Sequence, residues 1–365
     1  MDRLPHRPGR RPHGREPAAS FTVPGLVSTR VLDADLAALL WLMLDGNVPL
    51  VVAESPAVIR AFRSPDAAPE PIDDEREASD AARAVLDAFL DLLPPAVTRL
   101  DLDGADETFS WLGDVAALGG AALGHDLEPV ASPGGGRVGS AGDGVTMPSL
   151  ALPPQRLAPP ETTFLVAGEI GPDDHADMSG PRARLLLRAL ARGYGLGATV
   201  RADSLERVLV ALGAPPTSAS ADELRRLGIV LVLDVPAHAR ADRVPPVERR
   251  QCAGPAPAGE PDGSWRVVAC HFVRPLDRDV AGHVQRRPPA VLAAWDDAHE
   301  RLEHFEWGVT AELAMRVGLS RDEFEREQIG RSRTLASLAA SGPVAPDALH
   351  ALLARRSRST TGGDA

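Results

Sequence analysis

The sequence predicts an α/β protein in which a mainly parallel sheet lies between two layers of helices. Short apolar runs alternate with segments of helical periodicity along the first two thirds of the chain, as expected for strand–helix–strand units. The run at 228–235 (GIVLVLDV) lacks polar alternation, which is typical of a strand buried on both faces. Hydrophobic residues make up 44% of the chain and aromatic residues only 4%, so the core must be built mainly from Ala, Val and Leu.

The elements of this sheet follow one another from residue 33 onward. Asp33 starts an apolar helix that ends near Gly46, and the pair Pro94–Pro95 ends a second helix, because proline cannot continue a helix. Loops are expected where Pro, Asp and Glu are frequent (63–78) and where Gly is frequent (131–144). Helices are expected at 33–45, 81–93, 181–193 and 204–212, and strands at 48–53, 97–102, 163–167, 196–200 and 228–235.

The last third of the chain has a different pattern. Two apolar runs at 291–295 and 302–307, separated by Asp, His and Glu, predict an antiparallel hairpin. The alternating run 265–273 predicts a further strand, and helices are expected at 321–340 and 346–355. The expected organisation is a disordered basic tail (1–20), a core (21–235), a linker (236–263), a C-terminal hairpin and helical region (264–355) and a second tail (356–365).

Composition excludes several classes of protein. The net charge of −12 argues against a nucleic-acid-binding protein, which needs a basic surface to follow phosphates. Cys252 and Cys270 form no CxxC pair, which favours a reduced cytoplasmic protein. We expect neither a signal peptide nor a membrane span, because the longest apolar run, 36–44, is about half of the ~20 residues that a membrane helix needs.

Four segments resemble, in their order, the traffic ATPases of type II and type IV secretion and of pilus assembly. Residues 22–53 resemble the helix and strand that precede the phosphate loop, and 163–171 (TFLVAGEIG) resembles the acidic strand motif. Residues 196–204 (LGATVRADS) resemble the histidine box, and 322–347 resembles the helical C-terminal tail. The resemblance covers residues 21–355 and implies a RecA-like P-loop core.

The resemblance assigns roles to particular residues. Glu169 matches the glutamate that organises metal and attacking water in these motors. Arg201 stands where the histidine of the box would fall, and Asp203 and Ser204 follow it. Glu169 therefore has a second interpretation, a structural role in which it caps a helix or pairs with an arginine.

The phosphate loop itself departs from the family. A P-loop needs glycines whose N–H groups surround phosphate, and a lysine that neutralises it, but the chain contains no lysine. In one register the loop after strand 48–53 contains Glu54, Ser55, Pro56 and Arg60. In the other, 54–78 is an insertion and the loop contains Ser79, Asp80 and Arg83. Neither register has the glycines, and arginine fits a tight loop poorly.

These departures predict a catalytically inactive relative that acts as a structural or regulatory subunit. No cofactor is expected, ATP and magnesium included. The expected partners are proteins, such as an active ATPase paralogue or a membrane component of a secretion system, in a homo- or hetero-oligomer at the inner membrane face. The alternative is an enzyme or ligand-binding protein that uses the old site for a non-standard nucleotide.

Other candidate sites are weaker. The glycine-rich run 134–144 follows no strand, so it lacks the context of a phosphate loop. No GxSxG elbow is present. Arginines four residues apart on one helix form a stripe that is either solvated or faces a neighbouring subunit; they are Arg184, Arg188 and Arg192. A histidine-rich region lacks helical metal-ligand spacing, so no metal site is expected; it contains His271, His283, His299 and His304, with Asp296, Asp297 and Glu300.

Overall fold

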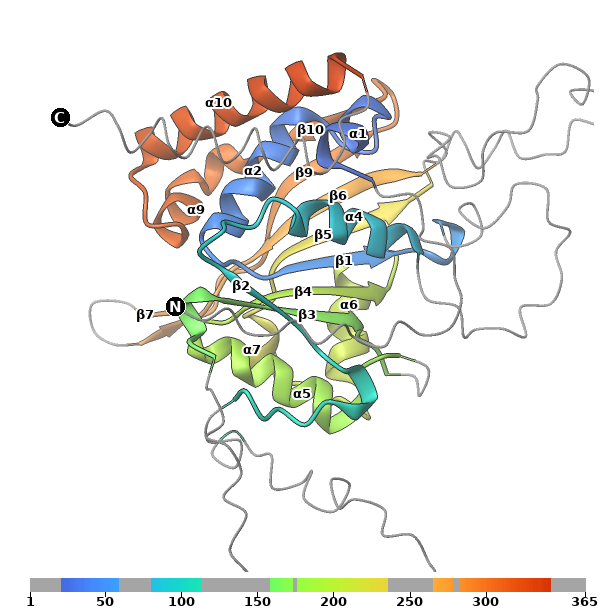
Figure 1. Cartoon of the computed structure of the whole chain (residues 1–365), viewed down its shortest axis with the longest axis vertical. Helices are drawn as coiled ribbons and strands as arrows, with labels where there is room; N and C mark the ends of the chain where they lie inside the picture. The colour runs from blue at the N-terminus through green and yellow to red at the C-terminus, as the bar shows by residue number, and fades with distance from the viewer. Residues whose placement is uncertain are drawn as a thin grey trace, which may run out of the picture.

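The computed structural model contains one eight-stranded sheet with helices on both faces (Figure 1). It describes residues 21–58, 80–112, 118, 158–172, 176–235, 265–278 and 283–342. The strand order is β10-β9-β6-β5-β1-β4-β3-β2. The expected α/β class with a mostly parallel sheet is therefore confirmed.

One part of the sheet is parallel and the other antiparallel. The parallel strands are β1 (Leu50–Glu54), β2 (Thr98–Asp101), β3 (Thr163–Glu169), β4 (Gly195–Arg201) and β5 (Gly228–Asp234). The antiparallel strands are β6 (Arg266–Val273), β9 (Ala290–Asp296) and β10 (Arg301–His304). Two short strands, β7 (Asp277–Arg278) and β8 (Val284–Gln285), form a separate hairpin.

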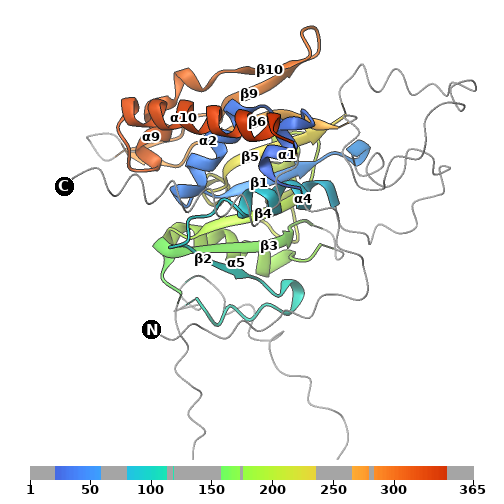
Figure 2. The same ribbon diagram turned by 45° about the horizontal axis from the view of Figure 1, so that its top comes forward.

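The helices form two layers, one on each face of the sheet (Figure 2). The first layer contains α1 (Val23–Ser28), α2 (Ala34–Asp45), α4 (Asp80–Leu90), α9 (Thr310–Arg316) and α10 (Arg321–Ala340). The second contains α5 (Gly180–Ala189), α6 (Leu205–Gly213) and α7 (Ala221–Leu224). Alternate residues of β1 enter the two cores, Leu50 and Val52 on one side and Val51 and Ala53 on the other, because successive strand side chains point to opposite faces.

The expected elements lie within a few residues of the observed ones. The strand expected at 302–307 ends at His304, because a 3₁₀ turn, η6 (Glu306–Gly308), follows it. The short helices α1, α7 and α9 were not predicted. The regions 1–20, 63–78, 131–144, 236–263, 346–355 and 356–365 lie outside the described residues.

The C-terminal region is continuous with the parallel sheet. Strand β6 pairs with β5, and α10 packs across α2. At that crossing the guanidinium of Arg331 lies 4.5 Å from the ring centroid of Trp41 and 2.5 Å from a carboxylate oxygen of Asp45. Residues from both ends of the chain therefore build one helical layer. Within the described ranges, no helix combines the length and apolar character needed to cross a bilayer.

His304 joins the start of α2 to the end of β10. Its Nε2 lies 2.8 Å from Oδ2 of Asp33, and its Nδ1 lies 3.5 Å from Oε2 of Glu306. Asp33 is also the N-cap of α2, because its Oδ1 accepts a hydrogen bond from the N–H of Leu36 at 2.9 Å. The hydrogen bond to Asp33 and the nearby carboxylate of Glu306 raise the pKa of His304 to about 10.

We expect the stabilising effect of His304 to depend on pH. Because its pKa is raised above the ordinary value of 6.5, the contribution is complete below about pH 6.5 and is lost as the pH rises to about 10. The loss in unfolding free energy caused by His304→Gln should be larger at pH 6 than at pH 10, by on the order of 2–4 kcal/mol. Urea unfolding at the two pH values measures this difference.

His271→Gln is the matched control, because burial lowers the pKa of His271. The loss in unfolding free energy caused by His271→Gln should not be larger at pH 6 than at pH 10. Equal losses for His304→Gln at both pH values would contradict an ionic role for His304.

Candidate functional site

The carboxyl ends of the five parallel strands meet at one edge of the sheet. The chain leaves β1 toward α4 in one helical layer, and it leaves the neighbouring strand β4 toward α6 in the other. In open α/β sheets, ligands bind in the crevice outside such a pair of strand ends. The edge beside β1 and β4 is therefore the candidate site.

The last residue of β1 is a buried acid. The side chain of Glu54 is fully buried, and its Oε2 accepts a hydrogen bond from the backbone N–H of Ala82 at 3.2 Å. Ala82 belongs to the first turn of α4. Helix N-termini carry partial positive charge and unpaired N–H groups, which attract anions. The carboxylate of Glu54 thus takes up one of the N–H donors at this helix N-terminus.

The residues after Glu54 join neighbouring strands. The hydroxyl of Ser55 donates to Oδ1 of Asp234 at 2.6 Å and accepts from the N–H of Val58 at 3.4 Å. Asp234 is the last residue of β5. Pro56 is exposed and begins a helical turn at 56–58. Ser55 therefore joins the start of this loop to the end of β5.

Glu169 and Arg201 form an ion pair between the ends of β3 and β4. The Nε of Arg201 lies 2.9 Å from Oε1 and 3.0 Å from Oε2 of Glu169. The side chain of Glu169 is 7% exposed and that of Arg201 is 26% exposed. The position of the expected histidine is therefore filled by the counter-ion of the acidic strand residue, as the structural interpretation of Glu169 anticipated.

Residue 168 must be a glycine because the side chain of Asp177 lies against it. The Oδ2 of Asp177 accepts a hydrogen bond from the N–H of Glu169 at 2.8 Å. A Cβ atom at position 168 would lie 1.8 Å from that same oxygen, well inside van der Waals contact. Local packing thus explains why a glycine precedes Glu169.

The remaining predicted site residues have structural roles or lie elsewhere. Ser204 is the N-cap of α6, accepting from the N–H of Arg207 at 3.4 Å, and its hydroxyl donates to Asp203 at 3.2 Å. Arg83 pairs with Asp87 one turn along α4, at 3.0 Å. Asp80 is the first residue of α4. Arg60 and Ser79 lie outside the described residues.

Two residues of this edge were missed by the sequence interpretation. Asp234 had a usable signal, since it ends an apolar run whose carboxyl end meets that of β1. Asp177 had none, because its contact with residue 168 depends on a turn without a motif. With both included, carboxylates outnumber guanidinium groups among the described residues of the edge, which is unfavourable for a phosphate ligand.

The arginine stripe on α5 is partly neutralised within the chain. The Nε atoms of Arg184 and Arg188 lie 3.3 Å and 2.5 Å from the carboxylate of Glu223. Arg188 also donates to the carbonyl of Leu118 at 2.6 Å. The hydrogen bonds lower the pKa of Glu223 despite its partial burial. These two arginines therefore join α5 to α7. Their position is explained by this contact, without invoking solvation or a neighbouring subunit.

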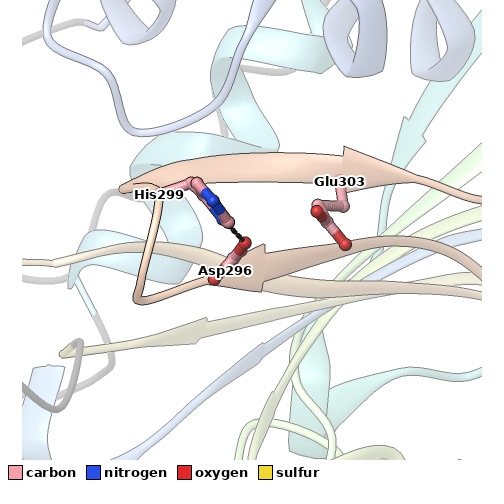
Figure 3. Close-up of side chains that lie close together, drawn as sticks. All are labelled: Asp296, His299 and Glu303. Carbon is pink, nitrogen blue, oxygen red and sulfur yellow. Dashed lines mark hydrogen bonds and ion pairs between the residues drawn. The ribbon is translucent and has the colours of Figure 1, made fainter.

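The histidine-rich region divides into separate contacts. Asp296, His299 and Glu303 lie together on the β9–β10 hairpin, with one potential ligand atom from each within 4.8 Å of the others (Figure 3). His299 is hydrogen-bonded to Asp296, and the side chain of His299 is 66% exposed. The guanidinium of Arg301 lies 3.8 Å from Glu303. Asp296 and Glu303 thus already have partners within the hairpin, and His304 lies with Asp33 instead.

Comparison with known proteins gives no family for this chain. No protein-family model matches the sequence, and no curated protein sequence matches it.

Gly168→Ala should destabilise the protein by about 2–3 kcal/mol, because the new methyl group collides with Asp177. Urea unfolding measures the change. In the double variant Gly168→Ala/Asp177→Ala the collision is removed, so the cost should be less than the sum of the two single costs by about 1 kcal/mol or more. Additive costs would show that Asp177 does not exclude a side chain at position 168.

Proposed function

We propose that this chain is a degenerate relative of the RecA-like secretion ATPases that does not turn over ATP and serves as a structural or regulatory subunit. The observation that carries the proposal is the buried carboxylate of Glu54 at the first turn of α4. A carboxylate at this position repels nucleotide phosphates and takes a hydrogen-bond donor that they would use.

The arrangement of strands supports the relationship. The strand before the degenerate loop, β1, and the strand with the acidic motif, β3, end at the same edge and are separated only by β4. Glu169 lies at that edge, beside the position of the histidine box. The order of the motifs in the sequence thus corresponds to their proximity in the fold.

The chemistry of the edge supports the loss of catalysis. Glu169 would have to receive metal and water, but its carboxylate is paired through both oxygens with Arg201. Removing one partner of such a half-buried pair costs free energy, because the other charge is left uncompensated. The pair therefore favours a fixed edge over one that opens for each catalytic cycle.

The purified protein should not hydrolyse ATP in the presence of Mg²⁺, and ATP should not raise its melting temperature. Phosphate release and a thermal-shift assay measure these two properties. Glu169→Gln is the control, since background turnover from a contaminant does not respond to it. Turnover that Glu169→Gln abolishes would refute the proposal, and stabilisation by ATP, GTP or a cyclic dinucleotide would favour a ligand-binding protein that reuses the site.

Glu54→Gln tests whether Glu54 is all that blocks the site. The variant keeps the shape but removes the charge at the α4 N-terminus, so we expect a loss of about 1 kcal/mol in unfolding free energy. We expect no gain of ATP binding, because the glycines and the lysine are also missing. ATP-dependent stabilisation of Glu54→Gln but not of the wild type would instead identify Glu54 as a single, reversible block.

A further inference from the structure

A cluster of arginines gathers at the edge of the sheet opposite the candidate site. Figure 1 shows α9 and the β7 hairpin on the side where β1 begins. Arg225 and Arg226 precede β5, and Arg274 follows the antiparallel strand β6. The basic cluster comprises Arg225, Arg226, Arg274, Arg286, Arg287 and Arg316.

Hydrogen bonds, ion pairs and neighbouring charges connect these arginines into one surface. Arg225 Nη1 donates to the carbonyl of Arg287 at 2.6 Å and lies 3.5 Å from that of Arg274. Arg274 and Arg287 each lie 3.0 Å from the carboxylate of Glu312 on α9. Arg316 follows Glu312 by one helical turn, and its charge interacts with that of Arg226.

The cluster contains more positive than negative charge. Among the described residues, its ion-pair partners are two carboxylates, Glu312 and Asp222. Arg225, Arg226 and Arg316 have no carboxylate partner within the same described part of the chain. Like charges held together without counter-ions are unfavourable, and an anionic ligand would relieve the repulsion.

Two of the guanidinium groups, those of Arg225 and Arg274, are held in place before any ligand binds. Arg274 donates to the carbonyl of Pro288 at 3.2 Å as well as to Glu312, and its side chain is 17% exposed. Arg225 is held by backbone carbonyls. Side chains fixed in this way lose little conformational entropy on binding, and guanidinium groups bind carboxylates through paired hydrogen bonds.

We propose that the basic cluster is a docking surface for a short acidic peptide segment of a protein partner. The overall charge favours this class of ligand. The chain carries a net charge of −12, so the surface outside the cluster is strongly acidic. A nucleic acid or an anionic membrane extends beyond the cluster and would be repelled there. A short run of Asp or Glu contacts the arginines alone.

The test measures binding of a labelled hexaglutamate peptide to the full-length protein by fluorescence anisotropy from 25 to 300 mM NaCl. We expect saturable binding that weakens with salt, and no binding of a neutral Gly–Ser peptide. Arg226→Gln/Arg316→Gln should weaken binding at least ~10-fold. The control Arg207→Gln/Arg333→Gln, which removes the same charge from exposed positions elsewhere, should stay within about twofold.

Arg226→Lys/Arg316→Lys provides a second variant that keeps the charge and loses the paired hydrogen bonds, and it should bind with intermediate affinity. Equal weakening in the Arg207/Arg333 control would overturn the proposal, because binding would then follow total charge. Absence of peptide binding would also overturn it. A third result would also overturn the proposal. In that result the protein binds phosphatidylserine vesicles or inorganic phosphate but not the peptide, and Arg226→Gln/Arg316→Gln abolishes this binding.

Discussion

The buried carboxylate of Glu54 is the constraint on which the carboxyl edge of the sheet depends. A carboxylate without solvent needs hydrogen-bond donors, and the first turn of α4 supplies one through Ala82. This contact sets the start of α4 against the end of β1. Helix α4 then packs over β4, where a Cβ at Gly197 would lie 3.1 Å from Leu86. The acid and the small residue of the next strand thus position the helix together.

The sequence predicted the central strands of the parallel sheet well, because β1, β3, β4 and β5 are apolar runs buried on both faces. The runs at 163–167 and 228–235 became β3 and β5 with little change. Short helices were harder. Helix α7 is stabilised by a capping box at Ser220 and Glu223 and has only four residues. Four residues are too few to show a helical period in the sequence.

The site was predicted in part, and the limits have physical causes. Glu54, Glu169 and Arg201 were singled out by the resemblance of their segments to family motifs, and each lies at the end of an apolar strand at the same edge. Their partners were not predictable to the same degree. The ion pair of Glu169 with Arg201 was one of two structural alternatives, and the contact of Asp177 with the N–H of Glu169 depends on how a turn folds back. Local patterns identify strand ends but not the side chains that later fold over them.

Helix α2 has a further consequence for how the protein is made. Its N-cap Asp33 contacts His304, 271 residues later, and Asp35 contacts Ser332, 297 residues later. Nearly the whole of α2 is buried, and much of its cover is α10. A ribosome releases the chain from its N-terminus, so this apolar helix is made well before the residues of α10 that cover it. Such long-range closure slows folding and leaves the apolar face of α2 exposed to solvent in the meantime.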